Sequence, residues 1–439
     1  MGRNRTNLML ALCVLCLVLG PFWSSQATRD GSALVSTTTV EGRLAVFDDV
    51  WETIQLRYYD PKYHGIDWQA KRAKFRPIAA RATGTYELYE VLRQMIASLK
   101  DAHTRVYSPD EKFDWWSPRY VTTGLTVREV EGAATVLHVE ATSAAARTDV
   151  RAGDVVVAVD DVPIREFIAR RLAAAGLAND DDARFRVIST LFDGPAGTSV
   201  KVSWTNNDGK QKSAVLQRYW NQRQLGFNNQ RKDKIAILRL DAFTQSVAFD
   251  FAKSLPAVLE DAEGIVLDLR SNGGGDAEAM ADIASLFLED GINLGKFADR
   301  SGASFELQTF SKRLWRFPQF SLTKLPLVVL TSEGTSSAAE ILVAALQIKG
   351  RARVVGTQTC GCVLAIRNRH ALPDGGILDV SEFDYRTAAG LRLEGLGITP
   401  DDVIPLRRAD VYSRRDRVIE MAKTMIKNNP EKLVTGLRD

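Results

Sequence analysis

The pattern of apolar positions changes along the chain and predicts helices in its first part. Between about residues 38 and 100, apolar side chains recur every three or four positions, as in Leu44, Phe47 and Trp51. A second set with the same spacing begins at Leu88. This period places the apolar side chains on one face of a helix, so the pattern predicts amphipathic helices packed on a core.

Shorter alternating runs separated by turns follow, from about residue 118 to 218. Gly124–Val130 and Thr135–Val139 read as two neighbouring strands, because apolar and polar residues alternate in them. A stretch of small residues then leads through Arg151-Ala-Gly-Asp154 into an apolar strand. The pattern predicts a mostly β domain, with a charged helical insert near residues 166–188.

Strands alternate with helices from about residue 230 to 408. The runs Ile235–Leu240, Gly264–Leu269 and Leu325–Leu330 are apolar almost throughout. Such runs are typical of strands in a sheet that is covered on both faces, so the predicted fold class is α/β. The charged tail, residues 411–439, contains one predicted helix.

The first 27 residues have the three parts of a secretory signal peptide. Arg3 and Arg5 precede an apolar run from Leu8 to Gly20, and small residues lead up to Ala27. The run is too short for a comfortable membrane-spanning helix, although a retained membrane anchor is the alternative. The pattern predicts export to the periplasm or the extracellular space.

Composition narrows the choice of partners. The 439 residues are 45% hydrophobic and 25% charged with a net charge of +3, so nothing favours binding to nucleic acid. No group of histidines and acidic residues has the spacing of a metal site, and no cofactor is expected. Cys13 and Cys16 lie in the signal, whereas Cys360 and Cys362 could form a disulfide or remain buried thiols.

Two segments could carry chemistry. The strand that ends at Leu269 continues into Arg270-Ser-Asn-Gly-Gly-Gly275, where backbone N–H groups can approach a ligand closely. This loop could bind phosphate, although it lacks the usual Gly-Lys-Ser/Thr ending, or form part of an oxyanion hole. In Thr335-Ser-Ser-Ala-Ala-Glu340, Ser336 or Ser337 could cap the following helix or be a nucleophile at its N-terminus.

Together these segments resemble the C-terminal processing peptidases and the tricorn-core serine proteases. Leu267–Gly275 is similar to the family's L-D-L-R-x-N-x-G-G, and Thr335–Glu340 is similar to S-A-S-A-S-E. Arg351–Thr359 and Gly390–Asp401 match two further motifs in the family's order. The resemblance implies a crotonase-like β/α protease core, an N-terminal helical region and an inserted, mostly β PDZ-like domain.

The same resemblance implies the nucleophile and the groups that stabilise its oxyanion. In the family the nucleophile lies three residues before the glutamate of the second motif, which here is Ser337. The N–H groups of Gly274 and Ala338 would hold the oxyanion. Glu340 is expected to be a structural residue at the start of the helix.

The general base distinguishes two branches of the family. One branch uses a lysine, but Cys362 occupies that position here, and a thiol cannot replace a desolvated amine as the base. His103 lies where the tricorn-like branch has its histidine base, with Glu394 as the third group and His370 as the reserve candidate. A histidine base predicts that kcat/KM rises through a pKa near about 6.5.

These inferences combine into one functional hypothesis. The protein is predicted to be a secreted serine endopeptidase that cleaves protein or peptide substrates through an acyl-enzyme. Its PDZ-like domain would bind extended or C-terminal peptide segments, with Thr123, Gly124 and Leu125 facing the carboxylate. The alternative is a catalytically inactive protein that binds peptides or apolar ligands. The predicted parts are a signal peptide (1–27), a helical region carrying His103 (28–117), the PDZ-like domain (118–218), the protease core (219–410) and the tail (411–439).

Overall fold

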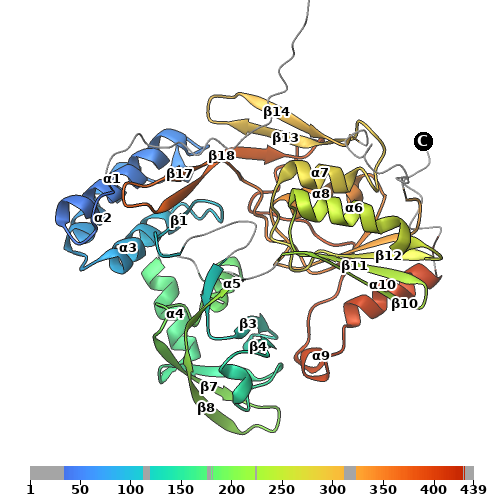
Figure 1. The fold of residues 1–439 in the computed structure, drawn as a ribbon, viewed down its shortest axis with the longest axis horizontal. Helices are drawn as coiled ribbons and strands as arrows, with labels where there is room; N and C mark the ends of the chain where they lie inside the picture. The colour runs from blue at the N-terminus through green and yellow to red at the C-terminus, as the bar shows by residue number, and fades with distance from the viewer. Residues whose placement is uncertain are drawn as a thin grey trace, which may run out of the picture.

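The computed structural model describes residues 34–111, 119–175, 179, 181–222, 225–310, 323–428 and 430. The predicted signal peptide lies outside these residues. Figure 1 shows helices α1 to α3 on one side of the molecule and the α/β core on the other. The mostly β module that contains α4, α5 and β3 to β8 lies below them.

The helices are α1 (Val40–Arg57), α2 (Trp68–Arg81), α3 (Thr85–Ala97), α4 (Ile164–Ala175), α5 (Asp181–Ser189), α6 (Gln245–Leu259), α7 (Ala277–Ala284), α8 (Ala338–Ile348), α9 (Arg408–Ser413) and α10 (Arg417–Asn428), with short 3-10 turns η1 (Tyr63–Gly65) and η2 (Ala145–Arg147). The strands are β1 (Arg105–Tyr107), β2 (Arg119–Thr122), β3 (Leu125–Val130), β4 (Ala133–Val139), β5 (Val155–Val159), β6 (Val162–Pro163), β7 (Ser199–Thr205), β8 (Gln211–Gln217), β9 (Tyr219–Gln222), β10 (Phe227–Lys232), β11 (Ile235–Leu240), β12 (Gly264–Asp268), β13 (Asn293–Asp299), β14 (Ser304–Gln308), β15 (Leu327–Thr331), β16 (Arg353–Gly356), β17 (Ala365–Ala371), β18 (Ile377–Arg386) and β19 (Asp402–Val403).

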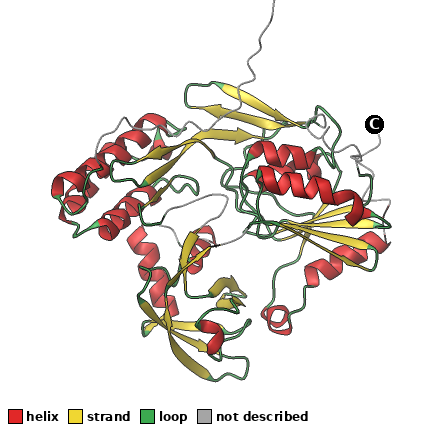
Figure 2. Ribbon diagram, viewed as in Figure 1, coloured by secondary structure: helices red, strands yellow, loops and turns green. Residues whose placement is uncertain are grey.

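The central sheet has the strand order β10-β11-β12-β15-β16-β19, and all its neighbours are parallel except the antiparallel pair β10 and β11. Its central strands are apolar on both faces. Ala236 and Leu238 pack in the core that contains α6, α7 and α8, whereas Ile235 and Ile237 pack with α10. Figure 2 shows these helices on opposite sides of the sheet. The predicted α/β class is therefore confirmed.

A second sheet brings together segments that lie far apart in the sequence. Its order is β1-β18-β13-β14, and β17 also pairs with β18. Helices α1 to α3 cover it, since Phe47 and Leu88 share one apolar core with Leu378 and Val380. Through this core the segment after α3, which carries His103, is attached to strand β18.

The module between residues 119 and 222 contains a third sheet, with the order β3-β4-β5-β7-β8 and β6 paired with β5. Strands β2 and β9, at the two ends of the module, pair with each other and so bring together the points where the chain enters and leaves the module. Strands β3 and β4 match the two strands predicted from the alternating pattern. Among the described residues β3 pairs with β4 alone, so it is an edge strand of this sheet.

The tail differs from the prediction. Two helices, α9 and α10, replace the single helix that the charged pattern indicated. The break lies at Arg414, which has a left-handed backbone with φ 56°. A new helix begins beyond it, because the side chain of Asp416 accepts the N–H of Ile419 at 3.0 Å. The prediction of one continuous helix was therefore wrong.

Candidate active site

Ser337 lies at the sharp turn between strand β15 and helix α8. Its backbone has φ 57° and ψ −128°, a conformation that non-glycine residues rarely adopt. Two acceptors hold this turn, because the Ser337 N–H donates to the carbonyl of Cys362 at 2.7 Å and to Glu340 Oε2 at 3.2 Å. The backbone N–H of the strained serine is thus held by two acceptors at the N-terminus of the helix.

The glycine loop after β12 packs directly against this serine. Gly274 has φ 93°, and a Cβ added there would lie 2.6 Å from Ser337 Cβ and 3.0 Å from the nitrogen of Ala338. Glycine is therefore required for the close approach. The structure brings Gly274, Ala338 and Ser337 together as predicted from the sequence. However, the Gly274 N–H donates to Asn272 Oδ1 at 2.8 Å, so in this conformation it is engaged by the protein itself.

Glu340 connects the start of α8 to the loop 359–362. Its buried carboxylate accepts hydrogen bonds from the N–H of Cys362 at 2.9 Å, the N–H of Gly361 at 2.7 Å and the hydroxyl of Thr359 at 2.5 Å. Burial raises the pKa of Glu340, and these donors oppose that shift. Glu340 therefore has two structural contacts, because its carboxylate binds the backbone at the start of α8, as expected, and also holds the loop 359–362.

Cys360 and Cys362 are joined by a disulfide, which decides between the two states that the sequence left open. The side chain of Cys362 is buried, and its sulfur is bonded to Cys360. Position 362 therefore carries neither an amine nor a free thiol.

Glu394 lies against the residues that follow this disulfide. Its Oε2 accepts the N–H of Val363 at 2.7 Å and the N–H of Leu364 at 3.2 Å. The pKa of Glu394 is raised to about 7, mainly by burial and also by the negative charge of Asp101, while the two N–H donors oppose the shift. Glu394 can therefore change its charge near neutral pH.

His103 is held on the loop between α3 and β1. The backbone N–H of His103 donates to Asp101 Oδ1 at 2.7 Å, and the hydroxyl of Thr104 donates to the other oxygen of the same carboxylate. Thr104 in turn accepts the N–H of Ser381 on β18 at 3.1 Å, which fastens the loop to the second sheet. Burial lowers the pKa of His103 to about 4, with Asp101 opposing the shift, so the imidazole is neutral at physiological pH.

The charge of Asp101 acts on two of the three residues predicted as the triad, but within the described residues no hydrogen bond joins the three. Asp101 influences the pKa of both His103 and Glu394. Within the residues that the structure describes, His103 Nδ1 is buried without a hydrogen-bond partner, and no hydrogen bond links His103 to Ser337 or to Glu394. The reserve candidate His370 lies on β17 with its Nε2 3.3 Å from Glu382 Oε1, so a different carboxylate engages it.

The loop predicted to face a peptide carboxylate precedes the edge strand β3. Thr123 and Leu125 are buried, and the Gly124 N–H donates to the hydroxyl of Thr122 at 3.0 Å. Gly124 has φ 84°, and a Cβ there would lie 2.1 Å from that of Ser143. This turn therefore tolerates glycine alone.

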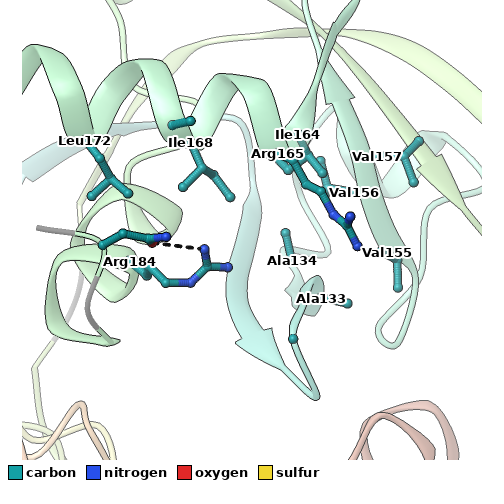
Figure 3. Close-up of a pocket in the computed structure, with 13 residues that line it drawn as sticks. Ala133, Ala134, Val155, Val156, Val157, Ile164, Arg165, Ile168, Leu172 and Arg184 are labelled. Atoms are coloured by element: carbon teal, nitrogen blue, oxygen red, sulfur yellow. Dashed lines mark hydrogen bonds between the residues drawn. The ribbon is translucent and has the colours of Figure 1, made fainter.

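A cavity of about 610 Å³ lies elsewhere in the same module, between α4 and strands β4 and β5. Figure 3 shows its apolar wall, which includes Val156, Ile168 and Leu172, and the side chains of Arg165 and Arg184 beside it. Neither the proposed catalytic residues nor the loop 123–125 line this cavity. It is thus separate from the candidate active site.

The described part of the chain contains neither a group of metal-binding side chains nor a membrane-spanning helix. It contains no group of three or more histidine, cysteine, aspartate or glutamate side chains able to hold a metal ion. None of its helices is both long and apolar enough to cross a membrane.

Comparison with known proteins identifies the class. Residues 234–404 match the family described as Peptidase family S41, and residues 41–97 match the Tricorn protease C1 domain. A carboxyl-terminal-processing protease of Picosynechococcus sp. is 28% identical over 415 residues, covering 92% of this chain and 90% of that protein. The chloroplastic carboxyl-terminal-processing peptidase 1 of Arabidopsis thaliana is 29% identical, with 81% and 71% covered.

Solved structures show that the fold is shared. Mature CPAF is 14% identical, with a TM-score of 0.65 and coverage of 89% of this chain and 98% of that one. The photosystem II D1 C-terminal processing protease is 23% identical, with a TM-score of 0.51 and coverage of 83% and 93%. By its match to peptidase family S41 and to carboxyl-terminal-processing proteases, the protein is a serine-type peptidase. Its matches to peptidase family S41 and to the Tricorn protease C1 domain confirm the resemblance inferred from the motifs.

Proposed function

We propose that the protein is an exported serine endopeptidase that cleaves peptide bonds through an acyl-enzyme on Ser337. The observation that carries this proposal is the strained turn at Ser337, packed against Gly274 at the N-terminus of α8. The hydroxyl oxygen attacks the peptide carbonyl, and the Ala338 N–H donates to the resulting oxyanion. The Gly274 N–H becomes a second donor once it exchanges Asn272 Oδ1 for the substrate.

In this mechanism His103 takes the proton of the attacking hydroxyl and later gives it to the leaving amine. Burial lowers the pKa of His103 to about 4, so the imidazole is neutral and has a free lone pair, but the same burial weakens it as a base. Glu394, when ionised, stabilises the imidazolium that forms. The loops that carry these residues must approach one another when substrate binds, as is common for catalytic hydrogen bonds that are long in a free enzyme.

Covalent labelling tests this proposal directly. A fluorophosphonate probe reacts with an activated serine, so we expect it to modify Ser337 in the purified protein. Peptide mapping by mass spectrometry identifies the modified residue. Absence of labelling, combined with tight binding of a peptide or an apolar ligand, would instead favour the catalytically inactive alternative.

We further propose that residues 118–218 form a PDZ-like domain that selects substrates, beside the helical region 28–117 and the core 219–410. The edge strand β3 offers its free side to an extended peptide. Helix α5 lies along this strand, because Arg184 forms two hydrogen bonds with Glu129 at 2.7 and 2.8 Å and Arg128 lies 4.8 Å from the ring centre of Phe185. A peptide added here would place its C-terminal carboxylate near the loop 123–125.

This arrangement predicts a preference for a free carboxylate. A peptide substrate with an apolar C-terminal residue and a free carboxylate should have a KM about tenfold lower than the same peptide with an amidated end. The amidated peptide lacks the carboxylate and so loses a charge-assisted hydrogen bond. Gly124→Ala should remove the preference by distorting the loop, since its Cβ would clash with Ser143.

Gly132→Ala is the matched control for this test. Gly132 also has a left-handed backbone, with φ 75°, but nothing lies within 4 Å of an added Cβ, so the preference should remain. Equal KM values for the two substrates in the wild type would contradict carboxylate recognition by this loop.

Export is also part of the proposal. The segment from Leu8 to Gly20 should be absent from the mature protein, which should begin close to Thr28 in the extracytoplasmic fraction. Fractionation of cells followed by N-terminal sequencing measures this. Recovery of an intact segment on membrane-bound protein would replace secretion with membrane anchoring.

A further inference from the structure

The disulfide between Cys360 and Cys362 lies in direct contact with the turn that carries Ser337. The Cys360 N–H donates to the carbonyl of Thr335 at 3.0 Å, and the carbonyl of Cys362 accepts the N–H of Ser337 at 2.7 Å. The two half-cystines therefore bond to positions on either side of Ser336. Any rotation of the peptide groups between them would move an acceptor of the strained serine.

The Cys-Gly-Cys turn, residues 360–362, also packs against the segment that carries Glu394. The carbonyl of Gly361 accepts the N–H of Gly395 at 2.8 Å, and Glu394 itself accepts the N–H of Val363. Gly361 has φ 70°, and a Cβ there would lie 2.9 Å from the nitrogen of Gly397, so the two segments are packed backbone to backbone. The Cys-Gly-Cys turn thus lies between the proposed nucleophile and the proposed acid.

Glu340, in the first turn of α8, also binds the Cys-Gly-Cys turn. Its carboxylate accepts the N–H groups of Gly361 and Cys362 and also that of Ser337. For all these bonds to coexist, the peptide groups of 360–362 must keep one orientation. A covalent link between the first and third residues removes most other conformations of such a short segment.

We propose that the Cys360–Cys362 disulfide is a positioning element of the active site, so that peptidase activity depends on its remaining oxidised. This inference rests on the proposed catalytic role of Ser337. Neither sulfur touches substrate in the proposed mechanism. The disulfide acts through the carbonyl of Cys362 and through Glu340, which hold the backbone of the nucleophile.

The Cys360–Cys362 disulfide would be reduced by thiol–disulfide exchange. A thiolate of a dithiol reductant attacks one sulfur, the bond between Cys360 and Cys362 breaks, and a mixed disulfide forms. The second thiol of the reductant then displaces this cysteine. Two electrons and two protons have passed to the protein, which holds two thiols, and the reductant has become a cyclic disulfide. A small-molecule disulfide reverses the reaction by the same exchange.

The test uses the full chain with Cys13→Ser and Cys16→Ser, so that only the pair in question responds to reductant. The kinetics of a peptide substrate are measured before and after treatment with dithiothreitol, and alkylation followed by mass spectrometry verifies the redox state. We expect kcat to fall about 10- to 100-fold on reduction, because small displacements of a nucleophile have effects of this size. KM should change less than twofold, and reoxidation should restore kcat.

The variant Cys360→Ser/Cys362→Ser is matched to the reduced protein in size and hydrogen-bonding capacity. It should have the low kcat permanently and should not respond to dithiothreitol. Equal kcat values for the oxidised and reduced proteins, or full activity in this variant, would overturn the inference.

Amide hydrogen exchange tests the role of the disulfide without depending on catalysis. Reduction should accelerate exchange across residues 336–341, because the acceptors of the Ser337 N–H lose their fixed orientation. If the oxidised protein has no peptidase activity, the proposed function fails, yet this measurement still decides the inference. Exchange that is identical in the two redox states would then overturn it.

Discussion

Ser337→Ala is expected to lower kcat by about 10⁴- to 10⁶-fold while leaving thermal unfolding nearly unchanged. The loss is large because no other group replaces the nucleophile. Stability should survive because the strained turn is held by the backbone N–H of Ser337, which alanine retains. Alanine also has the same difficulty as serine in adopting a positive φ. Steady-state kinetics and calorimetry on the two proteins measure both effects.

Ser336→Ala is the control for this variant, because it removes the neighbouring hydroxyl from the same loop. It should retain most of the activity. A Ser337→Ala protein that still turns over peptide, or a Ser336→Ala protein that does not, would move the nucleophile to the adjacent position. Either result would leave the S41 peptidase class in place and correct the residue.

His103→Ala should cause a loss of similar size, because the hydroxyl would have no base. Its cost in stability should be modest, since the ring nitrogen Nδ1 makes no hydrogen bond within the described residues. His370→Ala removes the contact between His370 on β17 and Glu382 on β18, and it is the matched histidine control. Full activity in His103→Ala, with loss in His370→Ala, would reverse the two assignments.

Much of this fold was predictable because its strands carry an unambiguous pattern. Ile235–Leu240 and Gly264–Leu269 are apolar on both faces, and they form neighbouring parallel strands as such patterns indicate. The division of the tail into α9 and α10 was not predictable in this way. It depends on a left-handed Arg414, and the charged residues around it are compatible with one helix or two.

The candidate site was predictable as a set of residues but not as a geometry. The motifs indicated Gly274 and Ser337, which lie far apart in sequence and are adjacent in the structure. They gave no sign that Asn272 engages the Gly274 N–H, because side-chain contacts of this kind depend on the folded loop. The many bonds of Glu340 were not predictable for the same reason, since three of them reach a segment about twenty residues further along the chain.

Burial also changes which group should control the pH dependence of kcat/KM. We expect kcat/KM to rise about tenfold per pH unit up to about pH 7 and then to level off, with Glu394 as the titrating group. Burial raises the pKa of Glu394 to about 7, so at lower pH its carboxyl is protonated and cannot stabilise an imidazolium. His103, with a pKa lowered to about 4, is already neutral over this range. A histidine base with an ordinary pKa would instead give a rise near about 6.5.

Glu394→Gln separates these two groups. The variant should lose about 10²- to 10⁴-fold in kcat, as expected when the acid of a triad becomes an amide. Its remaining activity should no longer rise near pH 7 and should retain only the rise near pH 4 that belongs to His103. Glu333 lies in the loop between β15 and Ser337, and its carboxylate accepts the hydroxyl of Thr357, so Glu333→Gln is a control that should keep the pH profile of the wild type. A rise near pH 7 that persists in Glu394→Gln would belong to another group.

The same titration should be visible in stability, independently of catalysis. The pKa of Glu394 is about 7 in the folded protein against an ordinary value of 4.5, so between these values the folded state binds a proton that the unfolded state has released. Stability contributed by the protonated form is therefore lost as pH rises through about 4.5 to 7. Glutamine has no such titration, so the Tm of Glu394→Gln minus that of the wild type should be more positive at pH 8 than at pH 5. A difference in Tm that is the same at both pH values would show that Glu394 has an ordinary pKa, and that some other group must account for a kinetic rise near pH 7.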